Sequence, residues 1–226
     1  MMRLHFVVEG QTEETFVNRV IVNHLGDFFV VGDVHSVTTS RKQGKIFRGG
    51  FPLGKGYDLL KTDLTLWMKQ DQKSDAVFTT MFDLYALPDD FPGFQDAMAC
   101  TDPYKRVGVL EAAMQKDITD RRFIPYIQLH EFEALLLADP RKLECQYIDQ
   151  SSAIDKLIKD VGSCPPELID DGPTTAPSKR IIQYLPEYSK QKTSTGSLVA
   201  EKIGLGTLRK KCPHFNDWLC RLEQLK

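Results

Sequence analysis

Three hydrophobic stretches of the chain each lead directly into acidic residues, and this recurrence is the strongest constraint on the fold. LHFVV ends at Glu9, DAVFTTMF ends at Asp83, and RFIPYIQL leads into HEFE, which contains Glu131 and Glu133. Short apolar runs that alternate with helical patterns predict the buried strands of a parallel sheet. Ligands of such sheets gather beyond the carboxyl ends of the strands, so these acids are candidates for one site.

The segment after Glu9 predicts a helix that begins close to this acid. Gly10 permits a tight turn, Thr12 can cap a helix, and the apolar spacing predicts a helix from about Glu13 to His24. A carboxylate at Glu13 would lie in the first turn, where the helix dipole stabilises it by ~0.3–1 kcal/mol. Two interpretations of Glu13 therefore stay open, helix capping and metal ligation.

The acids of the HEFE segment resemble half of a zinc-protease motif, but Ala134 stands where HExxH requires a second histidine. An extended backbone would place Glu131 and Glu133 on one face, whereas a helix would separate them. If these acids converge with Glu9 and Asp83, their mutual repulsion requires a cation in the gap. Oxygen ligands favour Mg²⁺ or Mn²⁺ over zinc.

A basic, glycine-rich stretch between residues 36 and 61 is the candidate nucleic-acid contact. Basic side chains on such a loop, with aromatic residues nearby, suit a phosphate backbone and stacked bases. The alternative is an ordinary solvated surface loop, since no phosphate-binding GxxxxGK[ST] motif is present. The residues expected to contact nucleic acid are Arg41, Lys42, Lys45, Arg48 and Lys55.

Composition narrows the class of protein by exclusion. The 29 basic and 31 acidic residues give a net charge of −2, so no global basic field attracts nucleic acid. The five cysteines are scattered without a CxxC pair, which argues against a disulfide framework and a zinc ribbon. No apolar run has the length of a membrane span, and we expect a soluble, cytoplasmic protein without membrane partners.

Strand and helix patterns alternate up to about residue 140, and mainly helical patterns follow, with short helices expected from Ser178 to Tyr188 and from Ser197 to Ile203. The expected fold is therefore α/β, with a mostly parallel sheet flanked by helices. We expect an α/β domain over residues 1–140 and a helical C-terminal extension over residues 141–226 that packs on the core.

Several segments together resemble a known family. VEGQTEE followed by a strand ending in FD resembles the Toprim fold of type IA topoisomerases, bacterial primases and the overcoming-lysogenization-defect nucleases. The wider set resembles an uncharacterised bacterial family of Toprim-like domains of unknown function, over nearly the whole chain. The segments of that set are VEGQTEETFV, FDLYALPDDFPGF, IQLHEFEALLLAD, SKRIIQYLPEY and IGLGTLRKKCPHFNDWL.

The resemblance implies roles for individual residues. Glu9 matches the Toprim glutamate, Glu13 matches a second acid of the nuclease branch, and Asp83 matches the first aspartate of the DxD motif. Tyr85 departs from the pattern because it stands where the second aspartate belongs. That departure raises the case for Glu13 as a ligand and requires Glu131 or Glu133 to supply the missing one.

A lysine near the end of the domain assists in the nuclease branch. Lys179 and Lys192 are the candidates for this role, and no motif separates them; we take Lys179 as the catalytic candidate.

The expected function is a Mg²⁺- or Mn²⁺-dependent phosphodiester hydrolase, an endonuclease of DNA or RNA that acts in phage defence or DNA processing. The resemblance also implies an ABC-type ATPase partner, which a separate chain would supply because no Walker motif is present. A catalytically inactive Toprim module that binds nucleic acid or the ATPase is the alternative, and Tyr85 favours it. A third possibility is nucleotidyl or small phosphate-ester chemistry at the same site.

Overall fold

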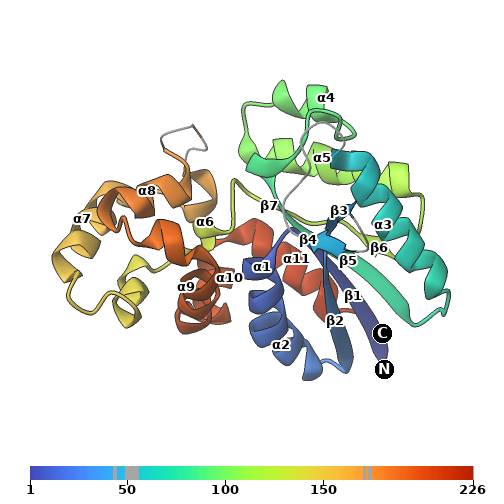
Figure 1. Ribbon diagram of the computed structural model, residues 1–226, viewed down its shortest axis with the longest axis horizontal. Helices are drawn as coiled ribbons and strands as arrows, with labels where there is room; N and C mark the ends of the chain where they lie inside the picture. Colours follow the sequence, from blue (N-terminus) through green and yellow to red (C-terminus); the bar gives the residue numbers. More distant parts are fainter. Residues whose placement is uncertain (43–44, 49–55, 170–171, 173–174, 226) are drawn as a thin grey trace.

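The computed structural model describes residues 1–42, 45–48, 56–169, 172 and 175–225, and for residues 38–42 and 45–48 it describes the backbone alone (Figure 1). A parallel sheet forms its centre, as the apolar runs predict. The strands lie in the order β2-β1-β5-β6, and β7 also pairs with β5. The strand bounds are β1 Met2–Val8, β2 Val30–Ser36, β5 Ala76–Asp83, β6 Phe123–Ile124 and β7 Ile127–Gln128.

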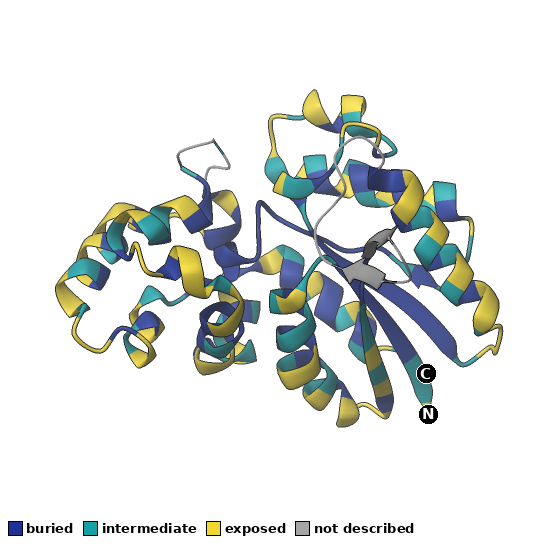
Figure 2. Cartoon of the chain, in the orientation of Figure 1, coloured by how far each residue is buried: buried dark blue, intermediate teal, exposed yellow. Residues whose placement is uncertain are grey.

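Helices cover both faces of the sheet, which explains why its central strands are apolar throughout. Leu4, Phe6 and Val8 of β1 belong to a core cluster with the first helical segment and the C-terminal helix, whereas Val7 packs with the helices on the opposite face. Figure 2 shows the buried centre of the sheet and the partly exposed edge strand β2. The covering helices are α1 Gln11–Phe16, a π-helical segment Val17–Ile21, α2 Val22–Gly26, α3 Gly56–Gln70, α4 Phe94–Met98, α5 Pro103–Ile118 and α11 Pro213–Glu223.

The C-terminal part is helical, as expected, and its last helix returns to the sheet. Trp218 of α11 donates a hydrogen bond from Nε1 to Thr79 Oγ1 of β5 at 2.9 Å, and its ring stacks on Tyr126 at 4.2 Å between centroids. A single core cluster consequently extends from Leu4 to Leu222. The remaining helices are α6 Glu133–Leu136, α7 Ser151–Val161, α8 Pro177–Tyr184, α9 Tyr188–Ile203 and α10 Leu205–Lys211, with short 3₁₀ turns at Leu84–Ala86, Pro140–Cys145 and Pro166–Leu168.

Three local expectations differ from the structure. The basic stretch is not wholly a loop, since β3 (Thr38–Lys42) and β4 (Lys45–Arg48) pair as an antiparallel hairpin. The predicted strand RFIPYIQL is divided into β6 and β7, because Pro125 lies between them and has no N–H to donate to a ladder. The Tyr126 N–H is accepted there by the Thr80 side chain at 2.9 Å.

The third difference is the length of α9. Short helices were expected up to Tyr188 and from Ser197, whereas α9 runs unbroken from Tyr188 to Ile203. Its centre contains Thr193, Ser194, Thr195 and Gly196, which have low helix propensity. Tertiary packing against α1 supplies the stability that the sequence of this segment lacks. Among the described residues, no helix is long and apolar enough to cross a membrane.

Candidate acidic site at the sheet edge

A cavity of about 370 Å³ lies at the carboxyl edge of the sheet and collects the predicted acids. It is bordered by the end of β1, the start of α1, the end of β5, the segment before α6 and one turn of α9. Its floor and walls also include Gly10, Tyr85 and Lys192. The acidic residues that line it are Glu9, Glu13, Asp83, Glu131 and Glu133.

The pairing of β1 and β5 brings Glu9 and Asp83 together. Val8 is the register partner of Met81, so both strands end at the same level of the sheet. The Asp83 N–H donates a hydrogen bond to Glu9 Oε2 at 3.2 Å. Gly10 then leads into α1, and a methyl group at Gly10 would lie 3.3 Å from Glu13 Oε2. The glycine thus leaves space for the Glu13 carboxylate beside the strand end.

A backbone turn at His130 directs the HEFE acids into the cavity. His130 adopts a left-handed conformation with φ of 62°, which few non-glycine residues adopt. Its carbonyl accepts the N–H of Tyr85 at 2.8 Å, so this turn is fastened to the end of β5. Glu131 precedes α6 and Glu133 begins it, and both side chains line the cavity. The expectation that a helix would separate them does not apply, because α6 starts only at Glu133.

The C-terminal helices supply hydrogen-bond donors to these two acids. Glu131 accepts bonds from the backbone N–H of Ser178 and from its hydroxyl, the latter at 3.1 Å. Glu133 Oε1 accepts the hydroxyl of Tyr188 at 3.0 Å and lies 3.3 Å from Lys192 Nζ. Sequence reasoning missed Ser178 and Tyr188, since they lie 47 and 55 residues from their partners.

Burial and mutual repulsion raise the pKa values of several of these acids. Burial first, and then the charge of Glu13, raises the pKa of Glu9 to about 8. Burial raises the pKa of Glu13 to about 7, with a further contribution from Glu133. The pKa of Asp83 rises well above its usual value through burial and the charge of Glu9. The pKa of Glu131 rises because of burial and the charge of Glu133.

The donor chemistry of the cavity fits a hard divalent cation. Asp83 Oδ1 is buried and has no hydrogen-bond partner among the described residues. Such an atom is costly unless a ligand or ion satisfies it. In the part of the chain that the structure describes, no three or more His, Cys, Asp or Glu side chains are arranged to hold a metal ion as they stand. Glu131 and Glu133 are instead bonded to Ser178, Tyr188 and Lys192.

The structure separates the two candidate lysines. Lys179 is exposed on α8 and is not part of the cavity lining, so the preference for it is not supported by its position. Lys192 lines the cavity and pairs with Glu133. Tyr85, in the place of the second DxD aspartate, lies at the rim of the cavity with half of its surface exposed.

The predicted nucleic-acid contacts fall on a segment of which the structure says little. Arg41 and Lys42 belong to β3, and Lys45 and Arg48 belong to β4, but their side chains lie outside the described part. Lys55 lies wholly outside the described residues. Their role stays a prediction.

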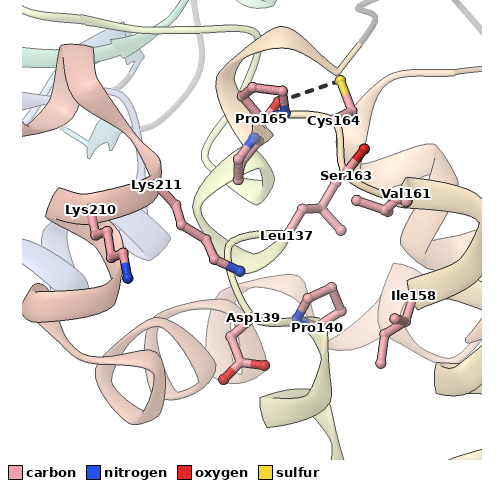
Figure 3. A pocket seen from close by; sticks show the side chains of 12 residues that line it. Leu137, Asp139, Pro140, Ile158, Val161, Ser163, Cys164, Pro165, Lys210 and Lys211 are labelled. Atoms are coloured by element: carbon pink, nitrogen blue, oxygen red, sulfur yellow. Dashed lines mark hydrogen bonds between the residues drawn. The ribbon is translucent and has the colours of Figure 1, made fainter.

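A second cavity, of about 440 Å³, lies between α7 and α10 and has a different character (Figure 3). Leu137, Ile158 and Val161 make much of its wall apolar. Lys210 and Lys211 also line this cavity. Lys211 is not free to bind a ligand, because its Nζ donates a hydrogen bond to the Ala138 carbonyl at 2.7 Å. With Asp139 as its acidic lining residue, this cavity lacks the set of carboxylates that distinguishes the first.

Fold and site together define an α/β protein with a cluster of acids at the carboxyl edge of a parallel sheet. The chain belongs to the family described as domain of unknown function DUF4276, whose match covers residues 8–223. The expected membership of a family of unknown function is therefore confirmed. Comparisons with the curated proteins and with the solved structures gave no match.

Proposed function

We propose that this protein is a Mg²⁺- or Mn²⁺-dependent phosphodiester hydrolase, an endonuclease that acts on DNA or RNA. The observation that carries the proposal is the convergence of acids from three separate segments in one cavity, with a buried Asp83 oxygen left without a partner. Oxygen-only ligand sets of this kind suit Mg²⁺ and Mn²⁺. A Toprim-like relationship, which the order of Glu9, Glu13 and Asp83 suggests, belongs to the same proposal.

The positions of the acids suggest which would bind the metal and which would accept a proton. Glu9 and Asp83 would hold the metal, together with Glu131 or Glu133 in place of the acid that Tyr85 replaces. The bound metal supplies Lewis-acid polarisation of the phosphate and activation of water. Glu13, with a pKa near 7, suits the acceptance of a proton from the attacking water.

Lys192 would offset negative charge in the same cavity. Its ammonium group lies 3.3 Å from Glu133 Oε1 and is the basic side chain in the cavity lining. On release from Glu133 it can pair with a phosphate oxygen of the substrate and offset developing negative charge. Glu133 is then free to turn toward the metal.

The test is a cleavage assay with supercoiled plasmid and single-stranded oligonucleotides in the presence of Mn²⁺. Cleavage should require the metal, stop on addition of EDTA, and be lost in Glu9→Gln. Glu187→Gln is the matched control, because Glu187 is an exposed residue at the start of α9 outside the cavity. Cleavage by Glu9→Gln at the rate of the control would refute the assigned site.

A catalytically inactive binding module is the second candidate, favoured by Tyr85 and by the carboxylates that are engaged with protein donors. Under this alternative, nucleic acid or an ABC-type ATPase from a separate chain would bind without cleavage. Phage defence and DNA processing are the settings that we propose for either activity. The same plasmid assay, repeated with a co-purified ATPase partner, separates the two candidates by whether strands are cut.

A further inference from the structure

Three cavities follow one another along the seam between α1 and α9. The acidic cavity is followed by one of about 430 Å³ and then by one of about 320 Å³. Thr193 lines all three, Gln11 joins the first to the second, and Thr15 and Arg19 join the second to the third. The shared residues place the three cavities side by side, and we call this row, which starts at the acids, the α1–α9 groove.

The chemistry of the groove changes with distance from the acids. Beyond the acidic cavity its lining consists mainly of hydroxyl, amide and basic side chains. Glu14 is its one carboxylate among the described lining residues, and that group accepts the hydroxyl of Ser36. The lining residues that bear on ligand binding are Arg19, Lys190, Thr193 and Ser194.

The local structure of both helices is unusual along this groove. Asn18 and Arg19 lie on the π-helical segment Val17–Ile21, and such segments occur frequently at functional sites. On α9, close packing explains Gly196, where a methyl group would lie 3.1 Å from Thr12 and 3.3 Å from the Tyr188 hydroxyl. Packing does not explain Thr193 and Ser194, which are exposed in the middle of a helix that their type disfavours.

The two basic groups of the groove are available to a ligand. Lys190 is exposed and makes no ion pair with a described residue. Arg19 lies 3.8 Å from Glu201, and both side chains are substantially exposed. Exposed pairs of this kind contribute about 0–1 kcal/mol, so a phosphate can displace Glu201 at little cost.

We propose that this α1–α9 groove binds the sugar–phosphate backbone of a single nucleic-acid strand whose scissile phosphodiester lies in the acidic cavity. Arg19 and Lys190 pair with phosphates, and the Thr193 hydroxyl donates a hydrogen bond to a phosphate or sugar oxygen. The inference rests on the proposed phosphodiester chemistry and adds the path that a single strand takes to the acidic cavity. It also places strand binding away from the basic hairpin.

The test measures binding apart from cleavage. Fluorescence anisotropy with labelled 20-nucleotide single-stranded DNA and RNA, in EDTA, compares wild type with R19A/K190A. The matched control is K202A/R221A, which removes the same charge from exposed positions outside the groove. We expect at least a tenfold loss of affinity in R19A/K190A and a salt-dependence slope smaller by about 1.4, since each single-strand phosphate contact contributes about 0.7. The control should bind within twofold of wild type.

Hydrolysis of bis(p-nitrophenyl) phosphate with Mn²⁺ distinguishes the groove from the metal site. R19A/K190A should keep wild-type turnover of this small diester and lose polymer cleavage at subsaturating strand concentration. If strand binding depends on the groove but neither substrate is hydrolysed, the result would contradict the proposed function and still support the groove. Equal binding by the groove and control variants, loss of small-diester turnover in the groove variant, or no strand binding by wild type would each overturn the groove.

Discussion

Glu9→Gln should stabilise the metal-free protein at pH 8 while it removes the metal-dependent activity. Burial and the charge of Glu13 raise the pKa of Glu9 from 4.5 to about 8. Between these two values the folded protein holds a proton that the unfolded chain has released. Stability from this group is therefore fully present below pH 4.5 and is lost as the pH rises toward 8. Glutamine has nearly the same shape as protonated glutamate and carries no charge, so the variant does not lose stability as the pH rises toward 8.

The size of the effect follows from the two pKa values. For an isolated carboxyl the change from 4.5 to about 8 would correspond to roughly 5 kcal/mol at pH 8. The titrations of Glu9 and Glu13 are coupled, and the Glu9 side chain is partly exposed to solvent. Both facts reduce the contribution of Glu9 alone to the free energy of unfolding. We expect about 2 kcal/mol of stabilisation at pH 8, which for a chain of this size is a Tm increase of about 4–8 °C.

Thermal unfolding in EDTA at pH 5 and pH 8 measures the difference in stability between Glu9→Gln and wild type. Glu9→Gln and wild type should differ little at pH 5 and separate at pH 8, whereas the exposed control Glu187→Gln should follow wild type at both. Added Mn²⁺ should stabilise wild type at pH 8 and not the variant, because binding to the folded state raises its stability. A Glu9→Gln variant that is destabilised equally at both pH values would contradict a raised pKa of Glu9, since Glu9 would then be an ordinary structural residue.

Three further changes test other parts of the structure. Lys192→Met, which releases Glu133, should lower Mn²⁺-dependent cleavage at least tenfold without weakening Mn²⁺ binding in calorimetry; unchanged cleavage would remove Lys192 from the site. Gly196→Val should destabilise the fold by about 1–3 kcal/mol in urea unfolding, because its side chain has no room between α9 and α1. Trp218→Phe should cost about 1–2 kcal/mol through loss of the hydrogen bond to buried Thr79, and a neutral result would mean that α11 does not hold the sheet as described.

The sequence predicts the sheet and its acids well because the signal is local. Strands buried on both faces leave continuous apolar runs, and parallel strands must end at one edge of the sheet. Glu9 and Asp83 therefore meet in the structure as their positions after β1 and β5 predict. Glu13 also lies at this edge, since α1 begins two residues after Glu9.

Long-range packing determines the features that the sequence leaves open. The choice between Lys179 and Lys192 depends on which helix reaches the cavity, and α9 does so because Gly196 allows its close approach to Thr12 of α1. No spacing in the sequence signals that contact. No local sequence pattern predicts the donors Ser178 and Tyr188 either, because each lies tens of residues from the acid that it contacts.

We propose above that the cavity at the carboxyl edge of the sheet binds a divalent metal. Anomalous X-ray scattering from a crystal soaked in Mn²⁺ tests it most directly. We expect a manganese peak in this cavity in contact with Glu9 and with the buried oxygen of Asp83, and no peak there in Glu9→Gln. Saturating Mn²⁺ that leaves the cavity of the wild-type protein without a peak would contradict it.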